Sequence, residues 1–384
     1  MLAVVFVTRT SMGFQFQSIA SVAPPLVADL GLNYAQVGTL VGLFTLPGAV
    51  FAIPGGLLGQ RFGDRRVVVA SLALMAVGGA VTAASGGFLP AAVGRLASGT
   101  GAVLMNILLV KMIADWFVGR EIATAMAVML TSWPVGLGLA AATLGRVAAA
   151  TSWRTAVLST TAAAILGLAL MLTLYRDPPR AAGGGPRVRA PGARLTWHDV
   201  SLSLSAGFAW GCFNASLVTV LAFGPGVLVA RGASVGEAGF VVSLAVWVTI
   251  VSVPLGGLVS DRIGRPNLLI VAGSLVATLV TMLLPVITPA TVGFCLLGLV
   301  VGAPPGPVMA LLPRTLAADR LATGFGAFYT VFYLAMTVTL PAAGLVRDLW
   351  GDPAAPVFFA GPVMAATALG LAIFRRLQRP TAGA

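Results

Sequence analysis

Twelve apolar segments, each about 20 residues long, follow one another along this chain of 384 residues. A helix of about 20 apolar residues is long enough to cross the hydrocarbon core of a bilayer. Backbone groups in lipid must pair within the segment, and the alternating strands of a membrane barrel are absent from the sequence, so we predict helices. The predicted fold class is an all-α membrane protein with twelve transmembrane helices, over residues 2–24, 35–59, 67–85, 88–113, 122–145, 153–175, 200–222, 237–259, 267–286, 289–312, 323–346 and 355–374.

The composition excludes a soluble enzyme or a soluble binding domain. Hydrophobic residues make up 58% of the chain and charged residues 9%, and the mean hydropathy is +0.99. A soluble domain carries about 25% charged residues, because it must present a polar surface to water.

The arginines are distributed unevenly over the loops. Sixteen fall in the loops after even-numbered segments and in the C-terminal tail, and four fall in the loops after odd-numbered segments. Basic residues in short loops favour the cytoplasmic side. We therefore predict that both termini are cytoplasmic, and that the net charge of +12 reflects this orientation and not a nucleic-acid partner. The chain has a single lysine, Lys111, and 22 arginines, which is typical of a GC-rich bacterial genome. We therefore expect the protein in the inner membrane of a bacterium.

Residues 176–199 form a long loop that is rich in glycine, proline and arginine and has no apolar period. This composition predicts a cytoplasmic linker. The linker divides the chain into residues 1–175 and residues 200–384, and we expect each part to form a six-helix bundle.

A loop motif is repeated at a constant offset of 201 residues. The sequence "GGLLGQRFGDRR" (Gly55–Arg66) follows the second segment, and "GGLVSDRIGRP" (Gly256–Pro266) follows the eighth. The aligned glycines allow a tight turn at the helix end, and the aligned arginines stay on the cytoplasmic face. The aligned pairs are Gly56 with Gly257, Arg61 with Arg262, and Gly63 with Gly264.

Both loops resemble the signature G-x-L-a-D-R-x-G-R of the major facilitator superfamily, which follows the second and eighth spans of its members. The sequence "GRLASGTGA" (Gly94–Ala102) on the fourth span is similar to the family's R-x-x-x-G-x-G motif, with Arg95 and Gly99 in place. The resemblance covers the whole chain. It implies two pseudo-symmetric six-helix bundles that work by alternating access, with spans 1, 4, 7 and 10 lining a central cavity.

The chain departs from the family pattern in two places. Gln60 stands where the family has an acidic residue in the first loop, whereas Asp261 is present in the second. Because the resemblance implies that this acidic residue latches the two halves on the cytoplasmic side, we expect the latch to depend on Asp261. The fifth span lacks the complete G-P-x-x-G-G signature of drug antiporters, which does not favour an efflux pump. The expected latch residues are Gly56, Arg61, Gly63, Gly257, Asp261, Arg262 and Gly264.

Charged residues at membrane depth are few. All eleven acidic residues fall in loops or within a few residues of a span end, whereas Arg9 and Arg95 lie inside spans. A charge at the centre of a span costs about 2.5–3.5 kcal/mol on insertion scales, so it marks a candidate functional site. A proton-driven pump for cationic drugs needs a buried carboxylate, and the sequence places none at membrane depth.

Arg9 permits two interpretations. It lies about 10 Å inside the cytoplasmic edge of the first span, and its stem is long enough to snorkel part of the way to the headgroups. Alternatively it faces a cavity and binds an anion, with Gln17 as a nearby neutral partner, because a guanidinium offers a planar fork of donors. Arg95 has a structural interpretation, in which it donates to backbone carbonyls of a neighbouring helix. The polar neighbours that favour a cavity around Arg9 are Thr8, Thr10, Ser11, Gln15 and Gln17.

Further cavity candidates are side chains at helical spacing. Trp210 and Asn214 are four residues apart on the seventh span, and Tyr329 and Tyr333 are four apart on the eleventh. Helix packing and the interfacial aromatic belt are the alternative explanations for such pairs. The sequence "GAPPGP" (302–307) predicts a break in the tenth span, and broken helices often border a substrate site. The predicted substrate-binding residues are Arg9, Gln17, Trp210, Asn214, Tyr329 and Tyr333.

The favoured function is secondary active transport of a small organic or inorganic anion, coupled to exchange or to a proton that travels with the substrate. Arg9 and the prolines Pro24 and Pro25 are loosely similar to the first span of the cyanate and nitroimidazole transporter group. A multidrug/proton efflux transporter and a non-transporting sensor on the same fold are the alternatives. The lone His198 and the unpaired cysteines form no catalytic or metal constellation, so we expect no enzyme, no metal and no cofactor. The expected partners are the anion and the lipid bilayer, for a monomeric protein.

Overall fold

The computed structural model describes residues 1–51, 54–117, 122–176, 195–317 and 320–378. All regular secondary structure in these ranges is helical. The helices of the first part of the chain are α1 (Leu2–Ser21), α2 (Ala23–Leu30), α3 (Tyr34–Leu43), α4 (Leu46–Phe51), α5 (Gly55–Phe62), α6 (Asp64–Ala83), α7 (Phe88–Phe117), α8 (Ile122–Ala150) and α9 (Trp153–Thr173). Those of the second part are α10 (Trp197–Ala230), α11 (Val235–Ile263), α12 (Pro266–Leu283), α13 (Ala290–Val300), α14 (Pro305–Met309), α15 (Leu321–Trp350) and α16 (Ala355–Gln378).

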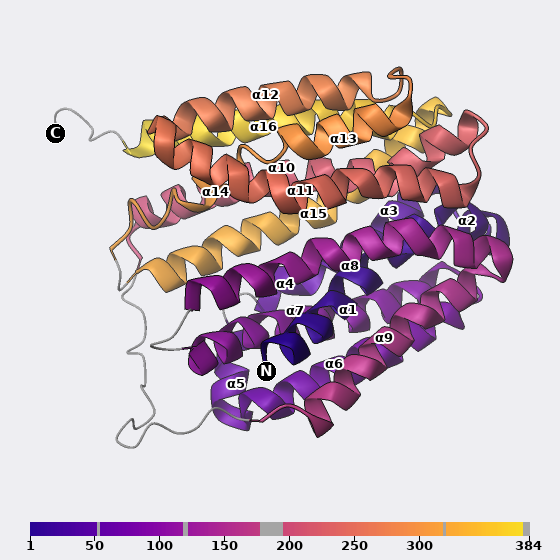
Figure 1. Cartoon of the computed structure of the whole chain (residues 1–384), viewed down its shortest axis with the longest axis horizontal. Coiled ribbons are helices and arrows are strands. Elements are labelled where there is room, and N and C mark those ends of the chain that lie inside the picture. Colours follow the sequence, from indigo (N-terminus) through magenta and orange to yellow (C-terminus); the bar gives the residue numbers. More distant parts are fainter. Residues whose placement is uncertain (52–53, 118–121, 177–194, 318–319, 379–384) are drawn as a thin grey trace.

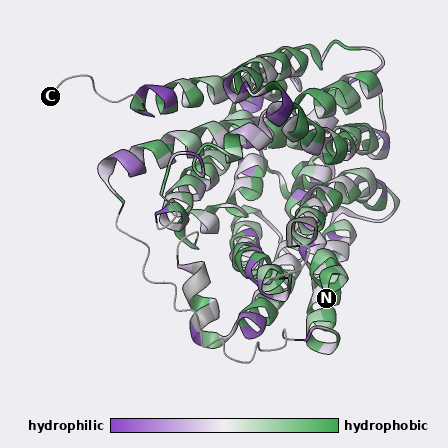
Figure 2. Cartoon of the chain, turned by 60° about the vertical axis from the view of Figure 1, so that its left-hand side comes forward, coloured by the Kyte–Doolittle hydropathy of each residue, from purple (hydrophilic) through white to green (hydrophobic). Residues whose placement is uncertain are grey.

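Eleven segments of the described chain are long and apolar enough to span a membrane. The expected twelfth segment corresponds to α1, which has 20 residues but carries Arg9 and several other buried polar side chains. Hydrophobic residues cover most of each helix (Figure 2). Large apolar side chains such as Leu89 (72% exposed) and Val338 (66% exposed) project outward, where the lipid tails of a bilayer would cover them.

Two of the spans are interrupted helices. Residues Tyr34–Phe51 comprise α3 and α4, and residues Ala290–Met309 comprise α13 and α14. The second break covers residues 301–304, as predicted from "GAPPGP", because Pro304 and Pro305 lack the N–H that continues the helical hydrogen bonds.

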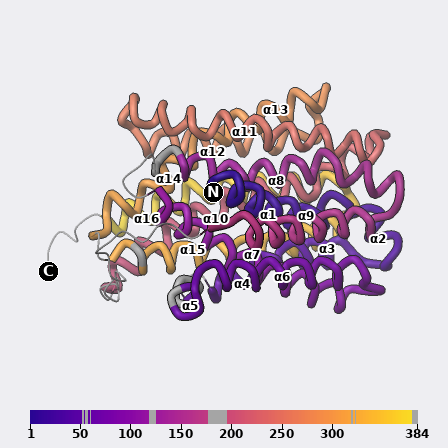
Figure 3. The backbone as a smooth tube through the Cα atoms, turned by 60° about the horizontal axis from the view of Figure 1, so that its bottom comes forward, coloured from indigo at the N-terminus to yellow at the C-terminus, as the bar shows by residue number. Residues whose placement is uncertain are grey.

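Helices α1–α9 lie together, and helices α10–α16 lie together (Figure 1). We call these the N-terminal and the C-terminal group. All five ion pairs among the described residues join residues of the same group. The groups meet where α3 and α4 pack on α15, where α8 packs on α11, and where α1 touches α10. Helix α2 lies at the end of the molecule opposite the C-terminal end of α16 (Figure 1, Figure 3).

Both repeated loops have a glycine with positive φ at the same aligned position. Gly63 follows α5 with φ +88°, and Gly264 follows α11 with φ +65°. Residues with a Cβ rarely adopt such angles, so the aligned glycines are the residues that let both helices end in a tight turn.

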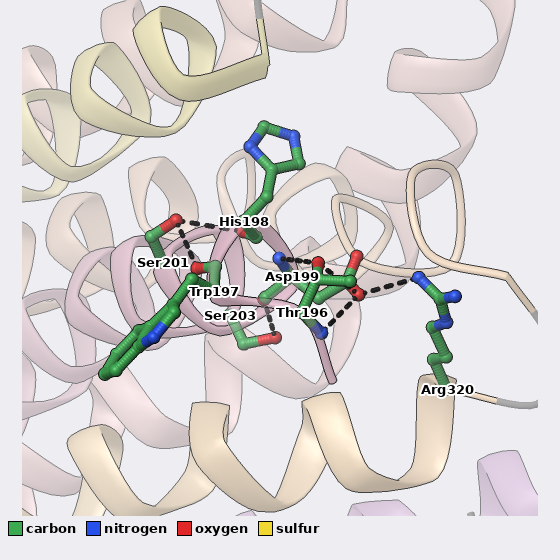
Figure 4. A network of polar contacts seen from close by, with 7 residues as sticks. All are labelled: Thr196, Trp197, His198, Asp199, Ser201, Ser203 and Arg320. Carbon is green, nitrogen blue, oxygen red and sulfur yellow. Dashed lines mark hydrogen bonds and ion pairs between the residues drawn. The ribbon is translucent and has the colours of Figure 1, made fainter. Parts of the chain in front are cut away.

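The second group begins at a capped helix end (Figure 4). Thr196 and Asp199 form a capping box at the start of α10, and Arg320 Nη1 donates to Asp199 Oδ2 at 3.0 Å. The predicted linker therefore ends earlier than expected, because residues 197–199 are already helical. Most of that linker, residues 177–194, lies outside the described residues. His198 lies on this first turn with its ring pointing away from the bonded groups (Figure 4).

Candidate functional site

A cavity of about 660 Å³ lies between the two groups. Its walls come from α8, α10 and α11, with Trp133 on one side and Trp210 and Phe213 on the other. Arg9 of α1 lines it as well, and among the described residues that line it Arg9 alone is charged. A cavity of this size is within the range of about 300–1,000 Å³ that accommodates small-molecule ligands.

The Arg9 guanidinium is held by neutral acceptors and is 7% exposed. Its Nε–H donates to Asn106 Oδ1 on α7 at 2.8 Å. Its Nη1 donates to the carbonyls of Met129 (3.1 Å) and Leu130 (3.2 Å) and to Ser132 Oγ (3.0 Å), all on α8. No acceptor among the described residues bonds Nη2, so its two hydrogens are free of these protein partners.

Pro134 explains why α8 offers acceptors to Arg9. The proline lies inside α8 and has no N–H, so the carbonyl four residues earlier, that of Leu130, loses its helical partner. An unpaired carbonyl at membrane depth is costly, and Arg9 Nη1 satisfies it. Arg9 thus stabilises the proline-containing helix α8 and also lines the cavity.

The electrostatic balance of the cavity is positive. Arg9 has no carboxylate partner among the described residues, and the described acidic residues lie in loops, in α2 or within the terminal turns of longer helices. The described chain also holds no cluster of three or more potential metal ligands. A buried arginine without an internal counter-ion favours an anionic occupant.

Arg95 has a different environment and is 1% exposed. Its Nε donates to the carbonyl of Leu40 (2.9 Å), and its two terminal nitrogens donate to the carbonyls of Gln15 (2.9 Å) and Phe16 (3.0 Å). The guanidinium also lies 4.5 Å from the centroid of the Phe44 ring. These contacts join α7 to α1 and α3. They match the structural interpretation of Arg95, in which it donates to backbone carbonyls of neighbouring helices. The second residue of that motif, Gly99, lies against the Phe44 backbone, where a Cβ would collide.

Three of the six predicted binding residues line the cavity: Arg9, Trp210 and Asn214. Gln17 does not lie beside Arg9, because its Nε2 donates to the Leu221 carbonyl of α10 at 3.2 Å. The neutral side chain of the predicted type beside Arg9 is Asn106, and not Gln17.

Tyr329 and Tyr333 belong to an aromatic cluster on α15, with their ring centroids 6.3 Å apart. Their phenol groups lie within electrostatic range of Arg9, but neither residue is among those that line the cavity.

The sequence analysis overlooked Asn106, Trp133 and Phe213. A signal for Asn106 was available, because it lies eleven residues after Arg95, about three helical turns, on the same face of α7. Trp133 and Phe213 carried no distinguishing signal, since aromatic residues are common in membrane spans.

One end of the interface between the groups is sealed, and we call it the closed end. There the backbone N–H groups of Tyr34 and Ala35, which begin α3, donate to the Asp348 carboxylate of α15 at 2.9 and 2.7 Å. The Arg347 guanidinium lies 3.6 Å from the centroid of the Tyr34 ring. The hydrogen bond between the groups that lies farthest from this end joins Thr330 Oγ1 to the Ala49 carbonyl (3.4 Å). Beyond it, no described hydrogen bond or ion pair crosses between the groups.

The expected latch residues lie at the opposite end. Asp261 is 76% exposed and lies 3.8 Å from Arg314 of its own group, and Arg61 stacks on its neighbour Phe62. Gly257 lies within α11 and Arg262 in the last turn of that helix. Gly56 lies within α5, and the side chain of Gln60 is outside the described part of the chain. Near the first repeated loop, Asp64 pairs with Lys111.

Comparison with known proteins places the chain among transporters. The chain is 25% identical to the hexuronate transporter of Bacillus subtilis (strain 168) over 64% of its own length and 61% of the relative's. It is 26% identical to the 3-(3-hydroxy-phenyl)propionate transporter of Escherichia coli (strain K12) over 97% of its own length and 93% of that protein.

Among solved structures, the inward open conformation of the xylose transporter XylE from E. coli has the same fold. The TM-score is 0.79 at 15% identity, over 96% of this chain and 94% of that one. The family model of the Major Facilitator Superfamily matches residues 5–226 and 200–384. The chain therefore belongs to the Major Facilitator Superfamily, whose members, like both of these relatives, are transporters and not enzymes.

Proposed function

We propose that this protein is a secondary active transporter of an organic anion. The observation that carries the proposal is Arg9, which lines the cavity, has only neutral protein partners among the described residues, and keeps its Nη2 hydrogens free of them. A guanidinium cannot escape burial by deprotonation, so an arriving anion is the natural source of compensating charge. The names of the two relatives, a hexuronate and a hydroxyphenylpropionate transporter, support this substrate class.

The proposed mechanism is alternating access between two six-helix bundles, residues 1–175 and 197–384, joined by a cytoplasmic linker, residues 176–196. In this proposal α1 is the twelfth span, and its polar residues are accommodated because the surrounding helices bury them. With both termini cytoplasmic, the closed end is extracellular and the structure is an inward-facing state. Asp261 would then latch the cytoplasmic side in the outward-facing state, when the groups meet there.

The proposed coupling is exchange of one anion for another, or a proton that travels with the substrate. Support comes from the cavity lining, which includes no carboxylate among the described residues. The same feature argues against the multidrug/proton antiporter, because that mechanism needs a buried acid to titrate.

The proposal is tested with purified protein in a thermal-shift screen against organic carboxylates, organic sulfonates and lipophilic cations. A ligand at 100 times its dissociation constant adds about 2.7 kcal/mol to stability, enough to identify a binder. The best anion is then followed by exchange in proteoliposomes. We expect Arg9→Gln to abolish both the anion-induced shift and exchange, and Arg9→Lys to recover part of each, because the ammonium keeps the charge but loses the planar geometry.

Arg231→Gln is the matched control, because this arginine lies in the loop after α10, away from the cavity, and its loss should leave binding unchanged. Stabilisation by cations alone, or full anion exchange by well-folded Arg9→Gln protein, would overturn the proposed function.

A further inference from the structure

Away from Arg9, the walls of the cavity are mostly apolar. Besides Arg9, the polar residues that line the cavity are Thr131, Asn214 and Thr249, and the rest of the lining is aliphatic, aromatic or proline. The two hydroxyls donate to their own helices, Thr131 to the Val128 carbonyl at 2.7 Å and Thr249 to the Val246 carbonyl at 2.6 Å. Each can therefore only accept a hydrogen bond from a ligand.

Donors away from Arg9 are equally scarce. Asn214 donates one amide hydrogen to the Trp210 carbonyl of its own helix at 2.8 Å, so its other amide hydrogen and its amide oxygen remain available to a ligand. The indole N–H groups of Trp133 and Trp210 complete the donor inventory of the described lining. A ligand with several hydroxyls would leave most of them without partners when bound, and unpaired buried polar groups oppose binding.

The aromatic side chains supply flat apolar surfaces on both sides of the cavity. Trp210 stacks on Phe213 with centroids 5.7 Å apart and an interplanar angle of 13°, in the C-terminal group. Trp133 belongs to the N-terminal group and is held by Phe16, with centroids 5.3 Å apart. A planar ring between these walls would contact both groups at once, whereas a small ion on Arg9 would contact one group and leave much of the 660 Å³ unfilled.

We propose that the transported anion is an aryl monocarboxylate, with the carboxylate on Arg9 Nη2 and the ring between Trp133 and the Trp210–Phe213 pair. This inference deepens the proposed function and rests on it. One acidic group matches the single free nitrogen of Arg9, and an apolar ring matches walls that offer few hydrogen bonds. Because the ring touches both groups, the ligand also joins the two parts that must move relative to each other during transport.

The test compares four probes on the wild-type protein by thermal shift and titration: 2-naphthylacetate, its uncharged amide 2-naphthylacetamide, glucuronate and acetate. We expect 2-naphthylacetate to bind with a dissociation constant about 100-fold or more below those of glucuronate and acetate, and to exchange in proteoliposomes. Binding of glucuronate or acetate as tight as that of 2-naphthylacetate overturns the aryl assignment and leaves the proposed anion transport intact. Binding of the amide as tight as that of the acid contradicts anion recognition and therefore the proposed function itself.

Variants test the placement of the ring. Trp210→Leu and Trp133→Leu should each weaken 2-naphthylacetate about tenfold while leaving hexanoate, an aliphatic acid, unchanged. Trp116→Leu is the control, because this tryptophan lies on α7 outside the cavity and donates to the Arg176 carbonyl. Equal losses for both acids in the two cavity variants would show that the rings serve only packing, and would overturn the placement. If a cavity variant does not fold, the four-probe series on the wild-type protein still decides the substrate class.

Discussion

At the scale of single residues, the two buried arginines differ in which guanidinium nitrogens have a hydrogen-bond partner among the described residues. Arg95 uses each of its three guanidinium nitrogens on a backbone carbonyl, so every nitrogen of the group stabilises the fold. Arg9, which lines the cavity, uses Nε and Nη1 on neutral acceptors, and no described residue bonds its Nη2. Loss of Arg9 removes several hydrogen bonds as well as a costly charge, so Arg9→Ala is expected to destabilise the protein.

Asn106 provides a test of the Arg9 charge that leaves Arg9 in place. Asn106→Asp puts a carboxylate at the oxygen that already accepts from Nε at 2.8 Å, giving Arg9 an internal counter-ion. We expect the variant to fold, and to bind the transported anion about 100-fold more weakly, or ~2.7 kcal/mol, because the substrate no longer neutralises a free cation. Titration and proteoliposome exchange measure the effect. Asn106→Ala removes the bond without adding charge, and a loss as large as that of Asn106→Asp would argue that geometry and not charge controls binding.

Asp29 is expected to make stability depend on acid. The Trp153 indole N–H donates to its carboxylate at 2.9 Å and Arg154 pairs with it, and both hold the pKa of Asp29 below its ordinary value of 3.8. A lowered folded-state pKa gives stability that is present above the ordinary pKa and is lost as pH falls through the lowered one. Asp29→Asn should therefore melt below the wild type near neutral pH, and the difference should shrink as the pH is lowered below 3.8, the ordinary pKa of the group. A melting difference that does not change with pH would contradict this assignment.

At the scale of elements, the closed end depends on the start of one helix. The first two N–H groups of α3 have no partner within the helix, and the Asp348 carboxylate from the other group accepts both. A carboxylate at a helix N-terminus is also favoured by the helix dipole, by about 0.3–1 kcal/mol at an exposed site. This contact joins the two groups at the closed end without an ion pair between side chains.

Asp348→Ala should open the closed end more often. The reporter is Ala222→Cys, a position 7% exposed near that seal, in a protein with Cys212 and Cys295 replaced by serine. We expect the labelling rate to rise about tenfold, because hydrogen bonds to a charged acceptor contribute about 1.5–3 kcal/mol. Asp352→Ala is the matched control, since this neighbouring acid accepts from Ala354 N–H within its own loop at 2.8 Å. An unchanged rate in Asp348→Ala, or an equal rise in the control, would show that the carboxylate does not hold the seal.

At the scale of the whole molecule, the proposed alternating-access mechanism requires the two groups to separate at the closed end and meet at the other. The described ion pairs all lie within a group, so each group can move as a unit without breaking them. The contacts that must exchange are those of α3 and α4 with α15 and of α8 with α11. Small residues such as Gly38 and Gly42 allow the close approach of α3 to α15 in the closed arrangement.

The orientation of the molecule in the membrane is tested by labelling from outside the cell. In a background without native cysteines, Gly351→Cys in the loop after α15 should react with an impermeant thiol reagent. Gly184→Cys, in the linker beyond the described residues, should react only after the membrane is permeabilised. The reverse pattern would place the termini outside and make the structure an outward-facing state.

The sequence by itself determined the features that depend on local chemistry. Apolar length predicted the spans, because lipid accepts only backbones that pair internally. The proline-rich "GAPPGP" predicted the break between α13 and α14, and the repeated loops identified the family together with the span 4 motif. The same reasoning selected Arg9 as a candidate site, because a charge at membrane depth is costly without a function or a partner.

Only the tertiary structure decided which side chains contact Arg9 and which line the cavity. Gln17 is close to Arg9 along α1, yet its amide bonds Leu221 of α10, because contacts between helices depend on packing and not on spacing within one helix. Arg9 is bonded from two other helices, by Asn106, Leu130 and Ser132. Pro134 leaves the Leu130 carbonyl without its helical partner, and only the folded chain brings that carbonyl close to Arg9. The aromatic walls likewise come from helices about 80 residues apart in the sequence, which no periodic pattern within one segment can reveal.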